Sequence, residues 1–117
     1  MGAEMVETLT RICASLAFNN QPPFRIVFPN YYRILNELGI TFLYTEQSDE
    51  QKDIENIFTA ILEVPDADDS IKFVALTFLK HPSAVVSSIS KKCVAEFESN
   101  PDNVAIVNAV KKRSKYY

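Results

Sequence analysis

Three side chains in this sequence are of the types that act most often as nucleophiles, general bases or zinc ligands: Cys13, His81 and Cys93. Zinc sites need thiolates and imidazoles at short spacings, and a catalytic thiol needs an imidazole within hydrogen-bond reach. The two cysteines stand far apart, and the only histidine lies between Lys80 and Pro82, where we expect an exposed helix end. We therefore predict no enzymatic activity, no metal and no other cofactor, with both thiols unpaired as in a reducing compartment.

Sites for phosphate groups or for calcium would need glycine-rich or acidic loops. Only Gly2 and Gly39 occur in the chain, which excludes a glycine-rich phosphate loop. Asp66, Asp68 and Asp69 are close in sequence, but their segment has neither the glycine nor the twelve-residue ligand spacing of a calcium loop. We expect these aspartates to cap a helix instead.

The charged residues divide along the chain. Residues 1–69 hold four basic and twelve acidic residues, a net charge of −8, and residues 70–117 hold eight basic and three acidic residues, a net charge of +5, which together give the −3 of the whole chain. We assign six basic residues to a binding surface: Lys91, Lys92, Lys111, Lys112, Arg113 and Lys115, the last four within a basic tail over 111–117. Because opposite charges steer association, we predict that this surface binds a protein partner such as an acidic peptide.

The same tail permits an alternative function. Tyr116 and Tyr117 follow its basic residues, and basic side chains beside aromatic rings hold the phosphates and bases of single-stranded nucleic acids. A sequence pI near 5.1 runs against a dedicated nucleic-acid binder. A small nucleic-acid-associated factor is therefore the second prediction, and a homo-oligomer formed by docking of oppositely charged ends is a further one.

A second candidate contact lies in the segment 24–33, which is rich in aromatic residues and arginine. Such side chains anchor many interfaces because each of them buries a large area. The candidates are Phe24, Arg25, Phe28, Tyr31, Tyr32 and Arg33. Packing into the core is the alternative for the aromatic rings among them.

Apolar residues recur at spacings of three and four along most of the chain, which predicts amphipathic helices. The expected helices cover residues 3–18, 31–38, 49–63 and 70–80, followed by one after Ser83 and one after Pro101. Expected caps are Asn30, Ser48 with Gln51 in a capping box, Asp68 or Asp69, and Ser83, while Gly39 is expected to end the second helix. Faces expected to be buried are Ile54, Ile57, Phe58, Ile61 and Leu62, then Val86, Ile89, Cys93 and Phe97, and finally Val104, Val107 and Val110.

Two short apolar runs, 24–28 and 40–44, are predicted to be extended. Both contain β-branched and aromatic residues, and both are bounded by residues that end a helix. Together they can form a minor two-stranded pair.

These observations predict an all-α protein, with a single domain over 1–117 built of five to six short helices. An orthogonal bundle and stacked hairpins of the HEAT or armadillo type both fit the pattern. Because no window approaches the roughly 18 uninterrupted apolar residues of a membrane span, we expect no membrane contact and a cytoplasmic protein. The function that fits is a non-enzymatic protein-interaction or regulatory module, which binds its partner through a helical groove and the basic surface.

Overall fold

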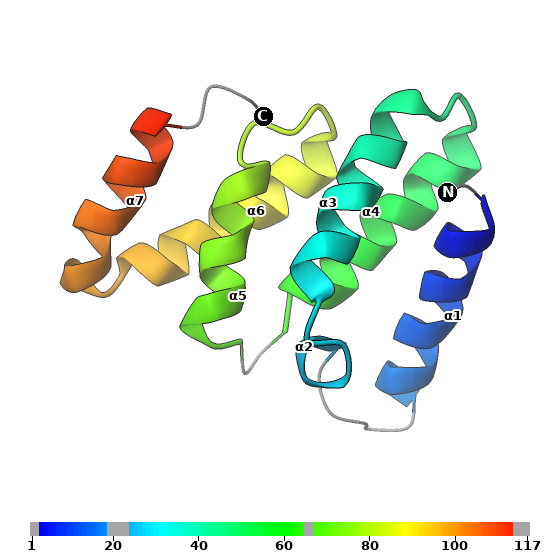
Figure 1. Ribbon diagram of the computed structural model, residues 1–117, viewed down its shortest axis with the longest axis horizontal. Coiled ribbons are helices and arrows are strands. Elements are labelled where there is room, and N and C mark those ends of the chain that lie inside the picture. The colour runs from blue at the N-terminus through cyan, green and yellow to red at the C-terminus, as the bar shows by residue number, and fades with distance from the viewer. Residues whose placement is uncertain (1–2, 19–23, 65–66, 114–117) are drawn as a thin grey trace. The chain divides into compact units, whose positions relative to one another are not determined.

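The computed structural model describes residues 3–18, 24–64 and 67–113, and its regular elements there are all helical (Figure 1). In chain order they are α1 (Ala3–Phe18), α2 (Phe24–Val27), α3 (Tyr31–Tyr44), α4 (Ser48–Leu62), α5 (Asp69–Val74), the 3₁₀ helix η1 (Ala75–Phe78), α6 (Ala84–Glu98) and α7 (Pro101–Arg113). The predicted all-α class is confirmed. These ranges hold seven α-helices rather than five to six, because α2 falls in a segment that we expected to be extended.

The chain forms two compact units, Met1–Val64 and Pro65–Tyr117, each defined by contacts among its own elements. Each unit has a central helix, α4 in the first and α6 in the second. The single domain over 1–117 stays a prediction, as does the choice between an orthogonal bundle and stacked hairpins.

Helix α4 forms the centre of the first unit and packs against both α1 and α3. Its apolar residues recur at spacings of three and four, so they share one side of the helix. All five side chains predicted to be inward are buried: Ile54, Ile57, Phe58, Ile61 and Leu62. The predicted bounds of α1, 3–18, are also confirmed.

The predicted extended run 24–28 is wrong, because α2 is a single helical turn. The backbone N–H of Phe28 donates to the Phe24 carbonyl at 2.8 Å, and the two phenyl rings lie 4.7 Å apart. A strand needs a partner strand to satisfy its backbone groups, and the only candidate, the run 40–44, is helical. The turn instead satisfies its backbone locally.

The predicted end of a helix at Gly39 is also wrong, because α3 continues through it to Tyr44. Glycine inside a helix costs about 1 kcal/mol relative to alanine, which other contacts can offset. Here Leu35, Leu38 and Gly39 are all buried, so the helix passes Gly39 where it packs into the core. Asn30 precedes the helix but makes no side-chain capping bond.

The capping box predicted at Ser48 does not form. Gln47 is the N-cap residue of α4, and Ser48 is already inside the helix. The side chain of Gln51 therefore does not reach back to Ser48, and its Nε2 donates to the carbonyl of Thr45 at 3.2 Å. The helix begins one residue earlier than predicted, and the bond from Gln51 to Thr45 secures its first turn.

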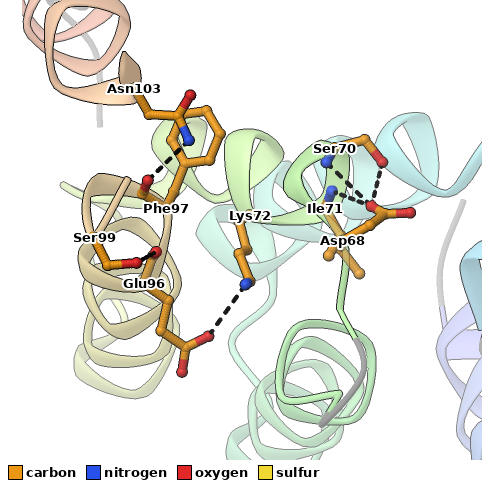
Figure 2. Close-up of polar contacts among 8 residues, drawn as sticks. All are labelled: Asp68, Ser70, Ile71, Lys72, Glu96, Phe97, Ser99 and Asn103. Carbon is orange, nitrogen blue, oxygen red and sulfur yellow. Dashed lines mark hydrogen bonds and ion pairs between the residues drawn. The ribbon is translucent and has the colours of Figure 1, made fainter. Parts of the chain in front are cut away.

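In the second unit α6 packs against α5, η1 and α7. Two predicted caps are confirmed. The Asp68 carboxylate accepts from the backbone N–H groups of Ser70 and Ile71 at 3.1 and 3.3 Å (Figure 2), and the Ser83 hydroxyl accepts from the Val86 N–H at 3.2 Å. The predicted inward stripe of α6 is buried throughout: Val86, Ile89, Cys93 and Phe97.

Helix α7 differs from the prediction in the side that it buries. Of its predicted stripe, Val107 is fully buried, Val104 is exposed and Val110 is half-buried. Asn103 is buried instead, and its amide donates to the carbonyl of Phe97 at 3.0 Å (Figure 2). The amide thus satisfies a buried carbonyl, which would be costly to leave without a partner.

Candidate functional site

His81 is buried, which corrects the prediction that it caps a helix end in solvent. Its Nδ1 accepts a hydrogen bond from the backbone N–H of Ser83 at 3.1 Å. The ring lies at the corner between η1 and α6, where Ser83 in turn caps α6. The imidazole thus has a structural role in joining two helices, because it satisfies an N–H group that the corner buries.

Neither cysteine forms a disulfide; Cys93 is buried and Cys13 is half-buried. Burial raises the pKa of the Cys13 thiol to about 11, whereas a reactive cysteine has a lowered pKa. Across the described ranges no group of three or more His, Cys, Asp or Glu side chains is arranged to hold a metal ion. The Cys13 thiol therefore lacks the lowered pKa of a reactive cysteine.

We expect iodoacetamide to alkylate Cys13 slowly in the native protein. With a pKa of about 11 in place of the ordinary 9, Cys13 has about 100-fold less thiolate at pH 8, and only the thiolate reacts. Alkylation followed by peptide mass mapping reports each cysteine separately, and the rate at Cys13 should rise as the pH rises toward 11. Equal rates in native and denatured protein at pH 8 would contradict this prediction.

The aromatic segment 24–33 divides between core and surface. Phe24 and Tyr31 are buried. Their rings therefore pack in the core and are not available to a partner. Phe28 and Arg25 are half-buried. Tyr32 and Arg33 are exposed, and the Arg33 guanidinium lies 5.9 Å from the centre of the Tyr32 ring.

Exposed apolar side chains are concentrated on the two helices that carry most of this segment. Among the described residues, ten large hydrophobic side chains are exposed, and six of the ten belong to α2 and α3. These six, which we call the α2–α3 apolar surface, are Ile26, Val27, Tyr32, Ile40, Leu43 and Tyr44, with exposed fractions from 42% to 81%. Sequence reasoning missed five of them because it assigned 40–44 to a strand and omitted 26 and 27.

Helix geometry places the four α3 members of this surface on one side. At about 100° per residue, positions 32, 40, 43 and 44 fall within an arc of about 120°. The buried residues Tyr31, Leu35 and Leu38 lie on the opposite side, and within its unit α3 packs against α4. Helix α3 is therefore apolar on two sides, only one of which contacts its own unit.

Comparison of the chain with protein-family models, curated proteins and solved structures finds no match. A functional assignment must therefore come from its own surfaces. The exposed apolar side chains also raise the question of a membrane, and no described helix is long and apolar enough to cross one.

The basic residues proposed for binding lie on α6 and α7, apart from Lys115, which is outside the described residues. Lys91 and Lys92 are exposed in the middle of α6, and Lys111, Lys112 and Arg113 are exposed in the last turn of α7. Acidic side chains interrupt this surface. Glu98 forms an ion pair with Lys111 at 3.3 Å, and Glu96 lies 4.0 Å from Lys72 (Figure 2 shows the second pair). Glu98 thus offsets one basic residue of this surface, and Glu96 pairs with Lys72 of α5, which lies outside it.

Proposed function

We propose that this chain is a non-enzymatic protein-interaction module, and that its partner binds the α2–α3 apolar surface. The observation that carries the proposal is the clustering of six of the ten exposed large hydrophobic side chains on two consecutive elements. Single exposed apolar residues are ordinary, but a contiguous group of them is typical of a binding surface.

The composition of the surface supports a protein partner. Tyr32 and Tyr44 are amphipathic rings that bury a large area at low entropic cost, and Arg33 stands beside Tyr32. Tyrosine and arginine are enriched among the residues that dominate binding energy, and isoleucine and leucine fill the space around them. Exposed aliphatic side chains would add nothing to the recognition of phosphate groups.

The basic residues of α6 and α7 form a second, weaker candidate contact, suited to an acidic peptide. Interspersed glutamates favour such a peptide over nucleic acid, whose dense phosphate charge demands an uninterrupted basic surface. We place this module in the cytoplasm, where reducing conditions suit two cysteines that form no disulfide.

Ile40→Asp should weaken the capture of partner proteins about tenfold or more, because a carboxylate in the contact must lose its water without gaining a partner. The matched control is Ile106→Asp on α7, since Ile40 is 48% exposed and Ile106 is 45% exposed. Affinity capture from the host with each tagged chain, quantified by mass spectrometry, gives the comparison.

Proteins bound by both the unmodified chain and the Ile106→Asp control, but lost with Ile40→Asp, would support the proposal. Equal losses with the two variants would contradict it. A third bait, with Lys111, Lys112 and Arg113 replaced by glutamate, tests the basic contact. It should capture less partner protein than the unmodified chain, and the difference should be largest at low salt.

A further inference from the structure

We propose that His81 is an acid-sensitive switch: a proton taken up by its buried imidazole breaks the corner between η1 and α6 and loosens the second unit. This switch is independent of the α2–α3 apolar surface, which belongs to the first unit. Three observations support it: the hydrogen bond that Nδ1 accepts, the other hydrogen bonds that depend on it, and the charges of the surrounding elements.

The hydrogen bond at Nδ1 fixes the protonation state of the ring. The backbone N–H of Ser83 donates to the Nδ1 of His81 at 3.1 Å. An Nδ1 that accepts a hydrogen bond carries no proton, so the ring is neutral and its single proton is on Nε2. A second proton can enter only at Nδ1, where it would turn the acceptor into a donor that faces the Ser83 N–H. Protonation therefore requires this bond to break.

Further hydrogen bonds of the corner depend on the position of Ser83. Its hydroxyl accepts from the Val86 N–H at 3.2 Å, and its carbonyl accepts from the Ser87 N–H at 2.9 Å. The Ser87 hydroxyl donates in turn to the carbonyl of Leu79 at 2.8 Å. These bonds join the end of η1 to the first turn of α6, so a displaced Ser83 weakens both sides of the corner.

The surroundings of the ring disfavour a positive charge. His81 is only 4% exposed, and Ser83, the N-cap of the 15-residue helix α6, is its hydrogen-bond partner. The N-terminal end of a helix dipole is positive and repels a cation. The carbonyls at the end of η1 would attract one, but those of Phe78 and Leu79 already accept from the His81 N–H and the Ser87 hydroxyl. Burying a charge here costs far more than burying the neutral ring.

The carboxylates of the surrounding elements lie toward solvent. Helices α5, α6 and α7 all pack against η1, which has no charged residue of its own. Their carboxylates, with that of the α5 cap, are exposed or half-buried: Asp68, Asp69, Glu96, Glu98 and Asp102. Two of these, Glu96 and Glu98, lie within 4.0 Å of lysine ammonium groups. No carboxylate in the described part of the second unit is buried with the ring.

The remaining titratable groups of these elements do not favour a proton on the ring either. Lys80 adjoins His81 in sequence, and further cations are Lys72 on α5, Lys91 and Lys92 on α6, and the basic residues 111–113 on α7. All of them oppose an additional positive charge. The other buried titratable side chain in this part of the chain is Cys93, and a thiol carries no charge in acid.

The unfolded chain therefore takes up the proton more readily than the folded second unit does. An exposed imidazole binds a proton near about pH 6.5, so the folded unit loses stability as the pH falls through this value. The ratio of unfolded to folded second unit should rise about tenfold from about pH 7.5 to about pH 5.5. Carboxylates stay ionised over this range, and His81 is the only histidine of the chain.

Amide hydrogen exchange of the full chain, followed by NMR at pH 7.5 and pH 5.5, tests this. After correction for the intrinsic effect of pH, the protection factors of the Ser83, Val86 and Ser87 amides should fall about tenfold at the lower pH. His81→Asn is the matched control, because asparagine can accept from the Ser83 N–H but does not titrate. Its protection factors at the same amides should be equal at the two pH values.

The imidazole itself gives a second measurement, which needs no variant because the chain has one histidine. In the folded protein the ¹⁵N shift of Nδ1 should be that of an unprotonated nitrogen, and it should stay so down to pH 5.5. A folded-state ring that titrates near about pH 6.5 would overturn the proposal. So would protection of Ser83 that is equal at both pH values, or that falls as much in His81→Asn.

Discussion

Replacing Phe58 by alanine should lower the free energy of unfolding by about 3–5 kcal/mol. Phe58 is fully buried on α4, the helix that packs against both α1 and α3. Its removal leaves a cavity in the core, which can close only partly because the helices around α4 are held by other contacts. Since whole domains are stable by only about 5–15 kcal/mol, this single change removes a large part of the stability of the first unit.

Urea denaturation followed by circular dichroism measures this loss. Phe73→Ala on α5 is the matched control, because Phe73 is 41% exposed and makes an edge contact with the Phe97 ring at 5.9 Å. The control should lose about 1 kcal/mol, the value of one aromatic pair. Similar losses in both variants would mean that α4 is not the centre of its unit.

Replacing His81 by alanine should cost about 2–4 kcal/mol of stability in the second unit. Two effects add together. The buried ring leaves a cavity, and the N–H of Ser83 loses the acceptor that it now has at 3.1 Å. Because Ser83 caps α6 through its hydroxyl, a displaced Ser83 also weakens the first turn of the central helix.

His81→Asn separates the two effects. An asparagine side chain can accept a bond from the backbone N–H two residues later, as the imidazole does here, but it is smaller. We expect it to lose less stability than His81→Ala in thermal or urea unfolding at neutral pH. If His81→Asn lowers the free energy of unfolding as much as His81→Ala does, the hydrogen bond to Ser83 contributes nothing to stability, and the loss comes only from the packing of the ring.

Much of this fold could be predicted from local patterns. The spacing of three and four in α4 and α6 identifies their buried sides because those helices have one apolar side and one polar side. Asp68 and Ser83 could be recognised as caps because a capping bond spans only two or three residues. Such features depend on neighbours in sequence, which the sequence displays directly.

Features that depend on distant contacts could not be predicted in this way. The segment 24–28 has the composition of a strand, but the described part of the chain holds no strand to pair with it, and strand preference depends on such neighbours. Gly39 stays helical because the core of its unit covers it. His81 is buried because two helices meet around it, which its neighbours Lys80 and Pro82 do not reveal.

The candidate site was located only in part for the same reason. Tyr32 and Arg33 were identified from their residue types, but Phe24 and Tyr31, of the same types, lie in the core. The exposed residues at 40–44 become visible only when 31–44 is recognised as one helix. A helix needs only one apolar side to pack into its own core. The second apolar side of 31–44 is therefore the sequence signal that could have predicted an exposed apolar surface.

The claim that the α2–α3 apolar surface is the contact surface is tested most directly by photo-crosslinking in the host cell. A photo-crosslinking amino acid replaces Ile40 in one chain and Ile106 in another, two positions of similar exposure on different units. We predict covalent adducts with partner proteins from position 40 and few from position 106. No adduct from position 40, or equal yields from both positions, would contradict the claim.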